Sequence, residues 1–271
     1  MSEISKSMKK RPIRPVKPAA PYLGGKRLLA KRIIPMIDAV SHKTYAEPFV
    51  GMGGIFLRRE SSPKSEVIND FNREVANLFR VLQRHYVAFL DMLKFQITSR
   101  PEFERLCKTR SDTLTDLECA AKFIYLQRTA FGGKVSGRNF GVAPGLPGRF
   151  DITKLGPILE ELHTRLSGVV IECLCYDDFI RRYDTKTTLF YIDPPYFFGE
   201  DDYGKDMFSR ADFVKLAAIL GEIKGKFLLS INDVQPIRKA FSAFKMVEVS
   251  TKYTVSGKGF KDAKELLISN F

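Results

Sequence analysis

Two patterns of apolar residues alternate along the chain. Short apolar runs stop at an acid, as TYA does before Glu47, VIN before Asp70 and LFYI before Asp193. Between such runs lie longer segments whose apolar residues recur at helical spacing, as in RLLAKRIIPMI and RADFVKLAAILGEI. Strands and helices in series predict an α/β fold with a parallel sheet and helices on its faces.

The middle of the chain has a different pattern. Apolar residues keep helical spacing from about 73 to 127, which predicts a helical subdomain. The segment 128–150 then combines six glycines with basic residues, and we expect an exposed hairpin or long loop there. Strands and helices alternate again in the rest of the chain, which ends in paired strands. The sequence therefore predicts one α/β domain, formed by 20–72 and 155–271, with the segment 73–154 inserted into it.

Composition and charge indicate which kinds of molecule the protein could bind. The 271 residues are 44% hydrophobic, enough for one sizeable core or a core with a small second domain. Lys and Arg number 44 against 31 Asp and Glu, and the formal net charge of +13 favours nucleic acid or an anionic membrane surface. Six of the basic residues and three prolines fall within the first eighteen positions. We therefore expect residues 1–19 to form a disordered basic arm that either solubilises the chain or binds phosphate.

Neither a membrane nor a metal is expected. No apolar stretch approaches the roughly 20 residues that span a bilayer, and no signal peptide is evident, so we expect a cytoplasmic protein. The histidines and cysteines lack the spacing of a metal site, and we expect no bound metal. The cysteines at 107, 119, 173 and 175 are interpreted as buried thiols in a reducing compartment.

Acids at strand ends indicate where a ligand would bind. Glu47, Asp70 and Asp193 each follow a predicted strand, and ligands of parallel α/β sheets bind outside the carboxyl ends of strands. Glu47 is followed in the sequence by a glycine loop at 51–54 and then by a predicted helix. The glycine loop would let the backbone approach a ligand closely. Asp70 lies 16 residues beyond Gly54, about where a ribose-binding acid belongs, so a nucleoside-containing cofactor would fit. Glu47 and Asp70 could each serve instead only as a helix cap or turn residue.

The third acid begins the tetrapeptide Asp193-Pro194-Pro195-Tyr196. The two prolines fix φ and remove two backbone donors, so the chain would leave the sheet as a rigid elbow with free carbonyl acceptors. The Asp193 carboxylate and the Pro194 carbonyl would then lie beside the Tyr196 ring. This arrangement suits a planar group that bears an exocyclic NH2, stacked on the ring with both N–H groups bound.

Taken in order, these segments resemble the Dam-type, or D12-class, family of DNA adenine N6-methyltransferases, from about 21 to 271. PYLGGK resembles the family's opening segment, AEPFVGMGG its glycine loop for S-adenosylmethionine, and VINDFN its ribose-binding acid. FIYLQRTAFGGKVSGRNFGV resembles the target-recognition hairpin, DPPY the catalytic tetrapeptide, LLSIND the next strand and KELLISN the closing strand. The family often has Trp at the position of Tyr22 and Ser or Thr at that of Gly54.

The resemblance implies a fold and a set of roles. The fold would be a Rossmann-like S-adenosylmethionine-dependent methyltransferase sheet with 73–154 as an inserted helical target-recognition subdomain. The residues implied to be catalytic are Asp193, Pro194 and Tyr196. Those implied or expected to bind the cofactor are Tyr22, Lys26, Glu47, Phe49, Gly51, Gly53, Asp70, Tyr176, Asp177 and Asp193. The target adenine of duplex DNA would be flipped out of the helix and attacked in line, without a metal.

The ribbon from Arg128 to Arg149 is the expected DNA-binding element. Arg138 and Asn139 would contact base edges, because arginine pairs with guanine and asparagine with adenine through two bonds each. Lys134 and Arg149, like Arg128, would meet the DNA backbone instead. The alternative is that the whole ribbon grips only the backbone, so that adenines are modified in loose sequence context.

Other functions stay open from the sequence alone. Cytosine N4, an RNA base or a glutamine amide would also present a planar NH2 group to the tetrapeptide. A catalytically silent nucleic-acid-binding module of the same fold is a further alternative. We expect a monomer in the cytoplasm of a bacterial or phage-infected cell, and the sequence does not indicate the recognised site or a restriction partner.

Overall fold

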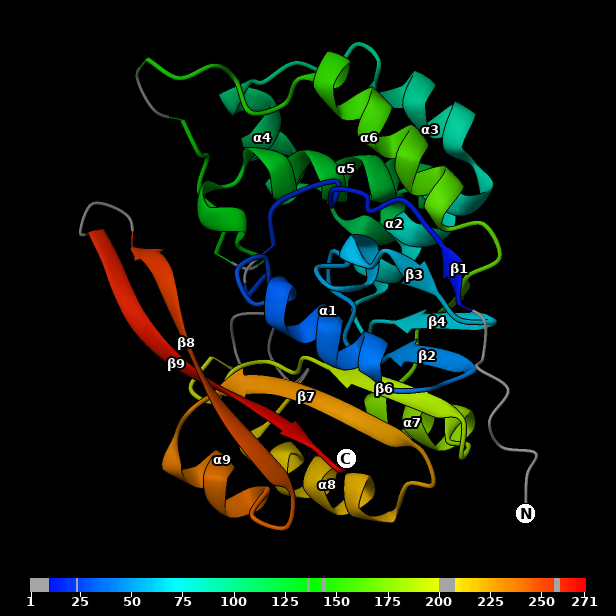
Figure 1. Ribbon diagram of the computed structural model, residues 1–271. Helices are drawn as coiled ribbons and strands as arrows, with labels where there is room; N and C mark the ends of the chain where they lie inside the picture. Colours follow the sequence, from blue (N-terminus) through cyan, green and yellow to red (C-terminus); the bar gives the residue numbers. More distant parts are fainter. Residues whose placement is uncertain (1–9, 23, 136, 143–144, 200–207, 256–258) are drawn as a thin grey trace.

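The computed structural model describes residues 10–22, 24–135, 137–142, 145–199, 208–255 and 259–271. Within these residues the core is a seven-stranded sheet with helices on both faces (Figure 1). Its strands, in spatial order, are β5 (Val170–Glu172), β4 (Ser65–Asn69), β2 (Thr44–Glu47), β6 (Thr188–Ile192), β7 (Lys226–Asn232), β9 (Gly259–Ser269) and β8 (Lys245–Val255). The first five are parallel, and β9 and β8 close the edge as an antiparallel pair. This confirms the predicted α/β architecture.

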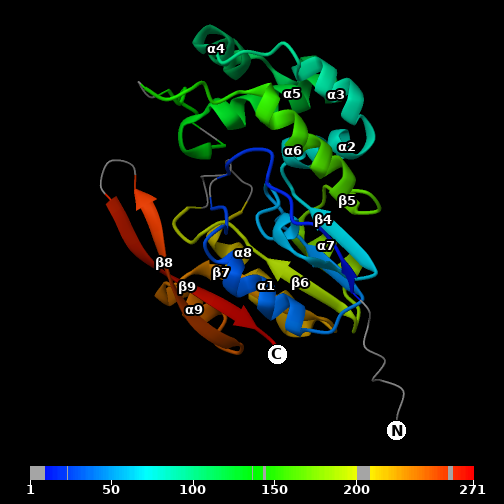
Figure 2. The ribbon, with the colours of Figure 1, turned by 45° about the horizontal axis from the view of Figure 1, so that its top comes forward.

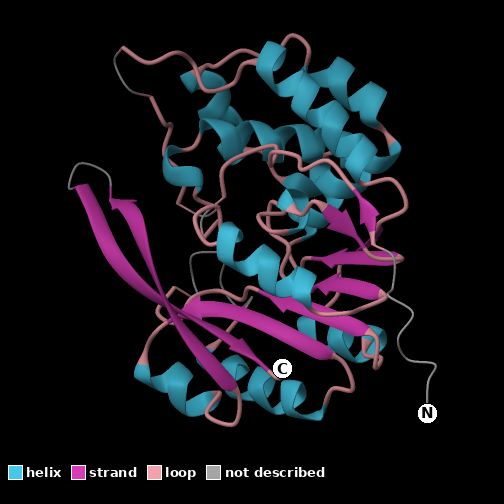
Figure 3. Cartoon of the chain, viewed as in Figure 1, coloured by secondary structure: helices cyan, strands magenta, loops and turns pink. Residues whose placement is uncertain are grey.

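The apolar strand sequences are explained by burial on both faces. In β6, Leu189 and Tyr191 pack into one hydrophobic cluster, and Phe190 and Ile192 pack into the other. Successive side chains of a strand point to opposite faces, so a strand covered on both sides must be apolar throughout. One face is covered by α1 (Ala30–Ala39), and the other by α7 (Tyr176–Tyr183), α8 (Arg210–Glu222) and α9 (Gln235–Ala240), as Figure 3 shows.

A helical region stands on the first face, beyond the β5 edge (Figure 2). It consists of α2 (Arg73–Arg84), α3 (Tyr86–Leu93), α4 (Arg100–Lys108), α5 (Asp116–Thr129) and α6 (Ile152–Arg165). α5 packs against α2 and α4, and α6 packs against α2 and α3. The predicted boundary between 154 and 155 therefore falls inside a helix that packs with this region.

The N-terminal segment differs from the expected disordered arm. β1 (Arg11–Pro12) pairs antiparallel with β3 (Ser61–Ser62), and the Val16 N–H donates to the Leu57 carbonyl at 2.8 Å. Val16 and Ala19 are also buried, so their apolar side chains anchor the segment to the core. The expectation of disorder is wrong for residues 10–19, and residues 1–9 lie outside the described part of the chain.

Two smaller expectations are also wrong. The glycine loop leads not into an α-helix but into one 3-10 turn (Phe56–Arg58), because the chain must reach β3 within a few residues. The cysteines are not buried, since Cys107, Cys173 and Cys175 are exposed and Cys119 is partly exposed.

The described residues contain no group of three or more His, Cys, Asp or Glu side chains placed to hold a metal ion. No described helix has the length and apolar character needed to cross a membrane.

Candidate active site

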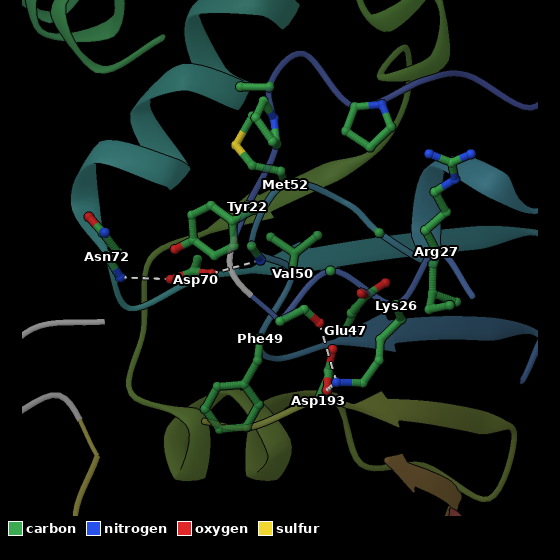
Figure 4. A pocket seen from close by; sticks show the side chains of 18 of the residues that line it. Tyr22, Lys26, Arg27, Glu47, Phe49, Val50, Met52, Asp70, Asn72 and Asp193 are labelled. Atoms are coloured by element: carbon green, nitrogen blue, oxygen red, sulfur yellow. Dashed lines mark hydrogen bonds and ion pairs between the residues drawn. The ribbon is translucent and has the colours of Figure 1, made fainter. Parts of the chain in front are cut away.

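A pocket of about 780 Å³ opens at the carboxyl edge of the sheet. It lies by the ends of β2 and β6, the point where the strand order reverses, which is where parallel α/β sheets bind ligands. Its volume lies within the range that holds a nucleoside-sized molecule. The predicted cofactor residues that line it are Gly51 and six residues labelled in Figure 4, namely Tyr22, Lys26, Glu47, Phe49, Asp70 and Asp193. Segments far apart in the sequence thus form one site.

The glycine loop shapes one wall of the pocket. Gly51 and Gly53 have φ values of 50° and 74°, a left-handed conformation that favours glycine. A Cβ atom on Gly51 would lie 3.1 Å from ring atoms of Tyr22, so glycine lets that ring pack against the loop. Gly53 does not line the pocket, but a Cβ there would come within 2.7 Å of the Leu57 side chain. Both glycines are therefore required by the turn itself.

Asp70 holds this loop and also faces the pocket. Its Oδ2 accepts a hydrogen bond from the Gly51 N–H at 2.9 Å, and its Oδ1 accepts one from the Asn72 N–H at 2.9 Å. Desolvation raises the pKa of Asp70 to about 6, and these two hydrogen bonds partly oppose the shift. The carboxylate is thus fixed in place at the pocket wall, where it can accept hydrogen bonds from a ligand.

Asn69, which sequence reasoning did not single out, joins three strand ends. Its Nδ2 donates to the Pro48 carbonyl at 2.9 Å and to the Leu174 carbonyl at 3.1 Å. Its Oδ1 accepts from the Leu174 N–H at 2.8 Å. A buried amide at the end of an apolar strand must find such partners, and that is the sequence signal that could have revealed it.

An ion pair links Lys26, in the segment before α1, to Asp193 of the tetrapeptide. The Lys26 ammonium lies 2.7 Å from Oδ1 of Asp193, and Ser230 Oγ donates to the same oxygen at 3.1 Å. The Lys26 side chain is only 2% exposed, and that of Asp193 is 19% exposed. Burial raises the pKa of Asp193 to about 6, although the charge of Lys26 acts to lower it.

Tyr196 is held by the same ammonium and by the closing strand. Its hydroxyl accepts a hydrogen bond from Lys26 Nζ at 2.9 Å and donates to Oε1 of Glu265 at 2.6 Å. Lys26 Nζ also lies 4.3 Å from the centroid of the Tyr196 ring. Glu265 is buried in β9 opposite Asn232 of β7, so the sheet carries its carboxylate to the carboxyl edge. The sequence identified KELLISN as a strand but indicated no role for Glu265.

Glu47 adds another buried carboxyl group to the site. Glu47 is buried at the end of β2, and its Oε2 accepts a hydrogen bond from the Tyr45 hydroxyl at 2.8 Å. Burial raises the pKa of Glu47 well above its usual value, and the nearby charge of Asp193 acts in the same direction. Glu47 lines the pocket together with Asp193 and Lys26, and Oε2 of Glu265 lies 3.9 Å from Lys26 Nζ. The same pocket is also lined by Lys17, Arg27, Arg58 and Arg128, so it contains charges of both signs.

Tyr176 and Asp177 lie behind the pocket wall rather than on it. The ring of Tyr176 stacks on that of Phe49 with centroids 5.6 Å apart, and its hydroxyl donates to Asp212 at 2.7 Å. Asp177 pairs with Lys215 of α8 at 2.7 Å. Of these two stacked rings, Phe49 is the one that lines the pocket, and Tyr176 supports it from behind.

The comparison with protein families decides the class of enzyme. Residues 22–255 match the family described as D12 class N6 adenine-specific DNA methyltransferase. The chain belongs to this family. It is an adenine-specific DNA methyltransferase that modifies N6, and the family implies S-adenosylmethionine as methyl donor. The family, the Rossmann-like fold class and the adenine N6 activity predicted from the sequence are thus confirmed, which decides against cytosine N4 and RNA.

Individual relatives span nearly the whole methyltransferase. The chain is 25% identical over 240 residues to "Type II methyltransferase M.CviBI" of Paramecium bursaria Chlorella virus NC1A, covering 88% of this chain and 91% of the relative. It is 25% identical over 277 residues to "Type II methyltransferase M1.LlaDCHI" of Lactococcus lactis subsp. cremoris, covering 94% and 96% respectively. A solved structure titled precorrin 8w decarboxylase, from Methanobacterium thermoautotrophicum, superposes with a TM-score of 0.40 at 10% identity, covering 96% of this chain and 100% of that one.

The predicted DNA-binding ribbon of the methyltransferase is only partly hairpin-like. An isolated antiparallel bridge joins Ala130 to Phe140, and the Phe131 N–H donates to the Asn139 carbonyl at 2.8 Å. The ribbon begins later than predicted, because Arg128 belongs to the last turn of α5. Positions 136 and 143–144 of the predicted ribbon lie outside the described residues.

The five predicted DNA-binding side chains have different environments. Lys134 and Asn139 are exposed. Arg138 is 13% exposed, with Nη2 4.0 Å from Oε2 of Glu74. Arg128 and Arg149 donate to backbone carbonyls, at 2.7 Å and 3.1 Å, and so brace neighbouring segments. Of the five side chains, those of Lys134 and Asn139 are therefore the ones exposed to solvent.

Proposed function

We propose that the pocket binds S-adenosylmethionine and that the tetrapeptide beside it holds a flipped adenine of double-stranded DNA. The observation that carries this proposal is the double position of Asp193. Its side chain lines the pocket, and it is the first residue of the Asp-Pro-Pro-Tyr segment. A methyl donor in the pocket and an amino group bound by the tetrapeptide would therefore meet at one residue.

The charges of the pocket fit this cofactor. S-adenosylmethionine supplies an electrophilic methyl group on a cationic sulfonium, and it also carries an ammonium. Glu47 and Asp193 line the pocket, and a positive charge of the ligand placed beside them would favour their ionised forms, which burial disfavours. Asp70, fixed by two backbone N–H groups, would accept hydrogen bonds from the ribose hydroxyls. Tyr22 and Phe49 supply apolar surface to the same wall.

Asp193 and Pro194 would bind the amino group of the adenine. Lys26 and Ser230 both contact Oδ1 of Asp193, so we assign Oδ2 to one N–H of the base. The Pro194 carbonyl would accept the other. Accepting both hydrogens opposes delocalisation of the nitrogen lone pair into the ring and directs it at the methyl group. After the base leaves the helix, the nitrogen would attack in line, so that the N–C bond would form as the C–S bond of the sulfonium breaks, and the nitrogen would then release one proton to solvent.

Tyr196 would form the surface on which the base stacks. Its hydroxyl is fixed by Lys26 and Glu265, so its ring has a defined orientation before any base arrives. Stacking of a base on an aromatic side chain contributes about 1–3 kcal/mol. Tyr196 thereby helps to offset the cost of unstacking the adenine from the duplex.

The inserted segment 73–154 would recognise the target. Exposed Lys134 and Asn139 would meet the DNA first, at a phosphate and a base edge respectively. Arg138 would reach a base edge only by leaving Glu74, and Arg128 and Arg149 would support the segment. The relatives are named Type II methyltransferases, which supports modification of a defined sequence. We place the enzyme, as a monomer, in the cytoplasm of a bacterial or phage-infected cell.

Methylation of random-sequence duplex DNA tests this function. Purified protein and S-adenosylmethionine should produce N6-methyladenine, and mapping the modified bases should reveal their sequence context. The Asp193→Ala variant serves as the inactive control. Methyl groups on cytosine, or none above the level of that variant, would contradict the proposal.

A further inference from the structure

A strained turn follows the tetrapeptide directly. The Gly199 N–H donates to the Tyr196 carbonyl at 2.8 Å, which closes a four-residue β-turn. Phe198, the third residue of this turn, has a φ of 75°. A positive φ at this position is typical of type II turns, where glycine or asparagine is expected. Among the described non-glycine residues, Phe198 is the one recorded with a positive φ.

The strain is maintained by Asn232 at the end of β7. Its Oδ1 accepts from the Phe197 N–H at 2.9 Å, and its Nδ2 donates to the Phe197 carbonyl at 3.0 Å. The Phe197 ring also packs against Phe213 of α8, with centroids 5.2 Å apart. Strained backbone persists where the surroundings fix it in this way, and such residues concentrate at functional sites.

Phe198 gains little burial in return for this strain. Its side chain is 68% exposed, although its ring has an edge contact with that of Phe197 at 4.7 Å. The guanidinium of Arg210 lies 5.3 Å from the Phe198 ring centroid. A glycine at this position would satisfy the turn and would not expose an aromatic ring to water. Folding therefore does not explain a phenylalanine here.

The position of the turn indicates what the ring contacts. Pro195 and Phe208, which precede and follow it in the chain, both line the pocket. The turn therefore stands at the rim of the site, next to the Tyr196 ring. An aromatic ring beside a guanidinium suits a nucleic acid, which offers a base face to the ring and a phosphate to the cation. The net charge of +13 agrees with such a partner.

We infer that Phe198 is a DNA-contact residue whose ring stacks on a duplex base next to the flipped adenine. This inference rests on the proposed function of the site. Apolar side chains inserted between base steps unstack and kink DNA, and here the ring would occupy part of the space that the adenine leaves. Phe198 would favour the flipped state without touching the reacting atoms. The strained turn would keep the ring presented to the DNA.

Two substitutions separate the ring from the strain. Phe198→Ala removes the ring and keeps a side chain in the left-handed conformation, whereas Phe198→Gly removes both the ring and the strain. Both should slow methylation of duplex DNA on the order of 10- to 100-fold and leave S-adenosylmethionine binding unchanged. Only Phe198→Gly should raise the melting temperature, by about 2–4 °C. Because Phe198→Ala keeps the strained conformation, a loss of activity shared by both variants would be due to the missing ring and not to the change in strain.

Base flipping is measured with 2-aminopurine in place of the target adenine of a duplex mapped with the wild-type enzyme. The wild type should increase the 2-aminopurine fluorescence, and both variants should increase it less. A mismatch opposite the target should partly restore their methylation, because an unpaired base costs less to extrude. Val170→Ala is the control, since that apolar side chain is 43% exposed at the start of β5, on the amino edge of the sheet away from the site, and it should behave as wild type.

The outcomes distinguish this inference from the function on which it rests. A wild-type enzyme that methylates no DNA would contradict the proposed function itself. A methylating wild type whose two Phe198 variants flip and methylate duplex DNA equally well would overturn the inference. Equal losses on duplex and single-stranded DNA would also overturn it, because they would show that Phe198 acts by shaping the tetrapeptide.

Discussion

Glu265 accepts a hydrogen bond from the hydroxyl of Tyr196 at 2.6 Å, across 69 positions of sequence. The carboxylate comes from β9, an antiparallel strand added to the edge of the parallel sheet, and its Oε2 lies 3.9 Å from Lys26 Nζ. The closing strand therefore fixes the orientation of the ring that we propose as the stacking surface for the base.

Replacing Glu265 by glutamine should slow methyl transfer about 10- to 100-fold, the effect expected when a charged hydrogen-bond partner of about 1.5–3 kcal/mol is lost. Gln keeps the shape of the side chain, so the fold should persist. The loss should be mainly in kcat with DNA, while cofactor affinity changes less. Steady-state kinetics with Glu248→Gln as control tests this, since Glu248 lies in β8 with a 60% exposed side chain. Equal rates for Glu265→Gln and wild type would exclude a positioning role.

The strands and the tetrapeptide could be predicted from the sequence because their signals are local. LFYI is apolar throughout because β6 is covered on both faces, and two prolines after Asp193 end the strand wherever the chain folds. Glu265 gave no such signal, because its role depends on the pairing of β7 with β9 and on Tyr196. Val16 likewise looked like part of a polar arm, although its burial depends on a distant core.

The contacts of two predicted DNA-binding arginines also could not be predicted from the sequence. Composition identifies Arg128 and Arg149 as basic residues near glycines, which favours contact with phosphate. Their guanidinium groups instead donate to the carbonyls of Ala19 and Ala130. The sequence shows that a side chain is charged, but it does not show which backbone carbonyl the side chain will contact after folding.

Asp70→Ala should weaken S-adenosylmethionine binding by about 10- to 100-fold, because the ribose hydroxyls would lose a charged acceptor worth about 1.5–3 kcal/mol. The substitution also frees the Gly51 and Asn72 N–H groups, which would loosen the glycine loop. Calorimetry on the two proteins measures the change. Asp178→Ala is the matched control, because that carboxylate is 66% exposed. Equal affinities for wild type and Asp70→Ala would remove Asp70 from the cofactor site.

Asp193 should make activity and stability depend on pH in opposite directions. Its pKa is raised from the ordinary 3.8 to about 6, with burial as the main cause. Between about pH 4 and pH 6 the folded chain therefore binds more protons at Asp193 than the unfolded chain does. The contribution of this group to stability is present at low pH and is lost as the pH rises through 6. Methyl transfer, which needs the ionised acceptor, should rise over the same interval.

The Asp193→Asn variant tests both directions. It should be inactive, and its free energy of unfolding relative to that of wild type should increase from pH 4 to pH 7, because it has no buried carboxylate to ionise. Lys26, Glu47, Ser230 and Glu265 surround the group in both proteins. Thermal unfolding at several pH values gives the comparison. A difference in stability that does not vary with pH, or an active variant, would contradict this role of Asp193.

The ribbon offers a final prediction about sequence recognition. Asn139 is exposed, and the Phe131 N–H binds its backbone carbonyl, so its side chain is presented from a fixed point. If it reads an adenine, Asn139→Ala should relax the methylated motif at one position and cost about 1–3 kcal/mol in discrimination. Lys134→Ala should instead weaken methylation evenly at all sites and make binding less dependent on salt, because a phosphate contact contains no sequence information.

Arg138→Ala tests whether Arg138 contacts DNA or stays beside Glu74. A relaxed motif would show that Arg138 leaves Glu74 to read a base, whereas an unchanged motif with a lower melting temperature would show that it stays against Glu74. Sequencing of methylated random DNA for all three variants decides among these roles, and an unchanged motif in Asn139→Ala would exclude base reading by that residue.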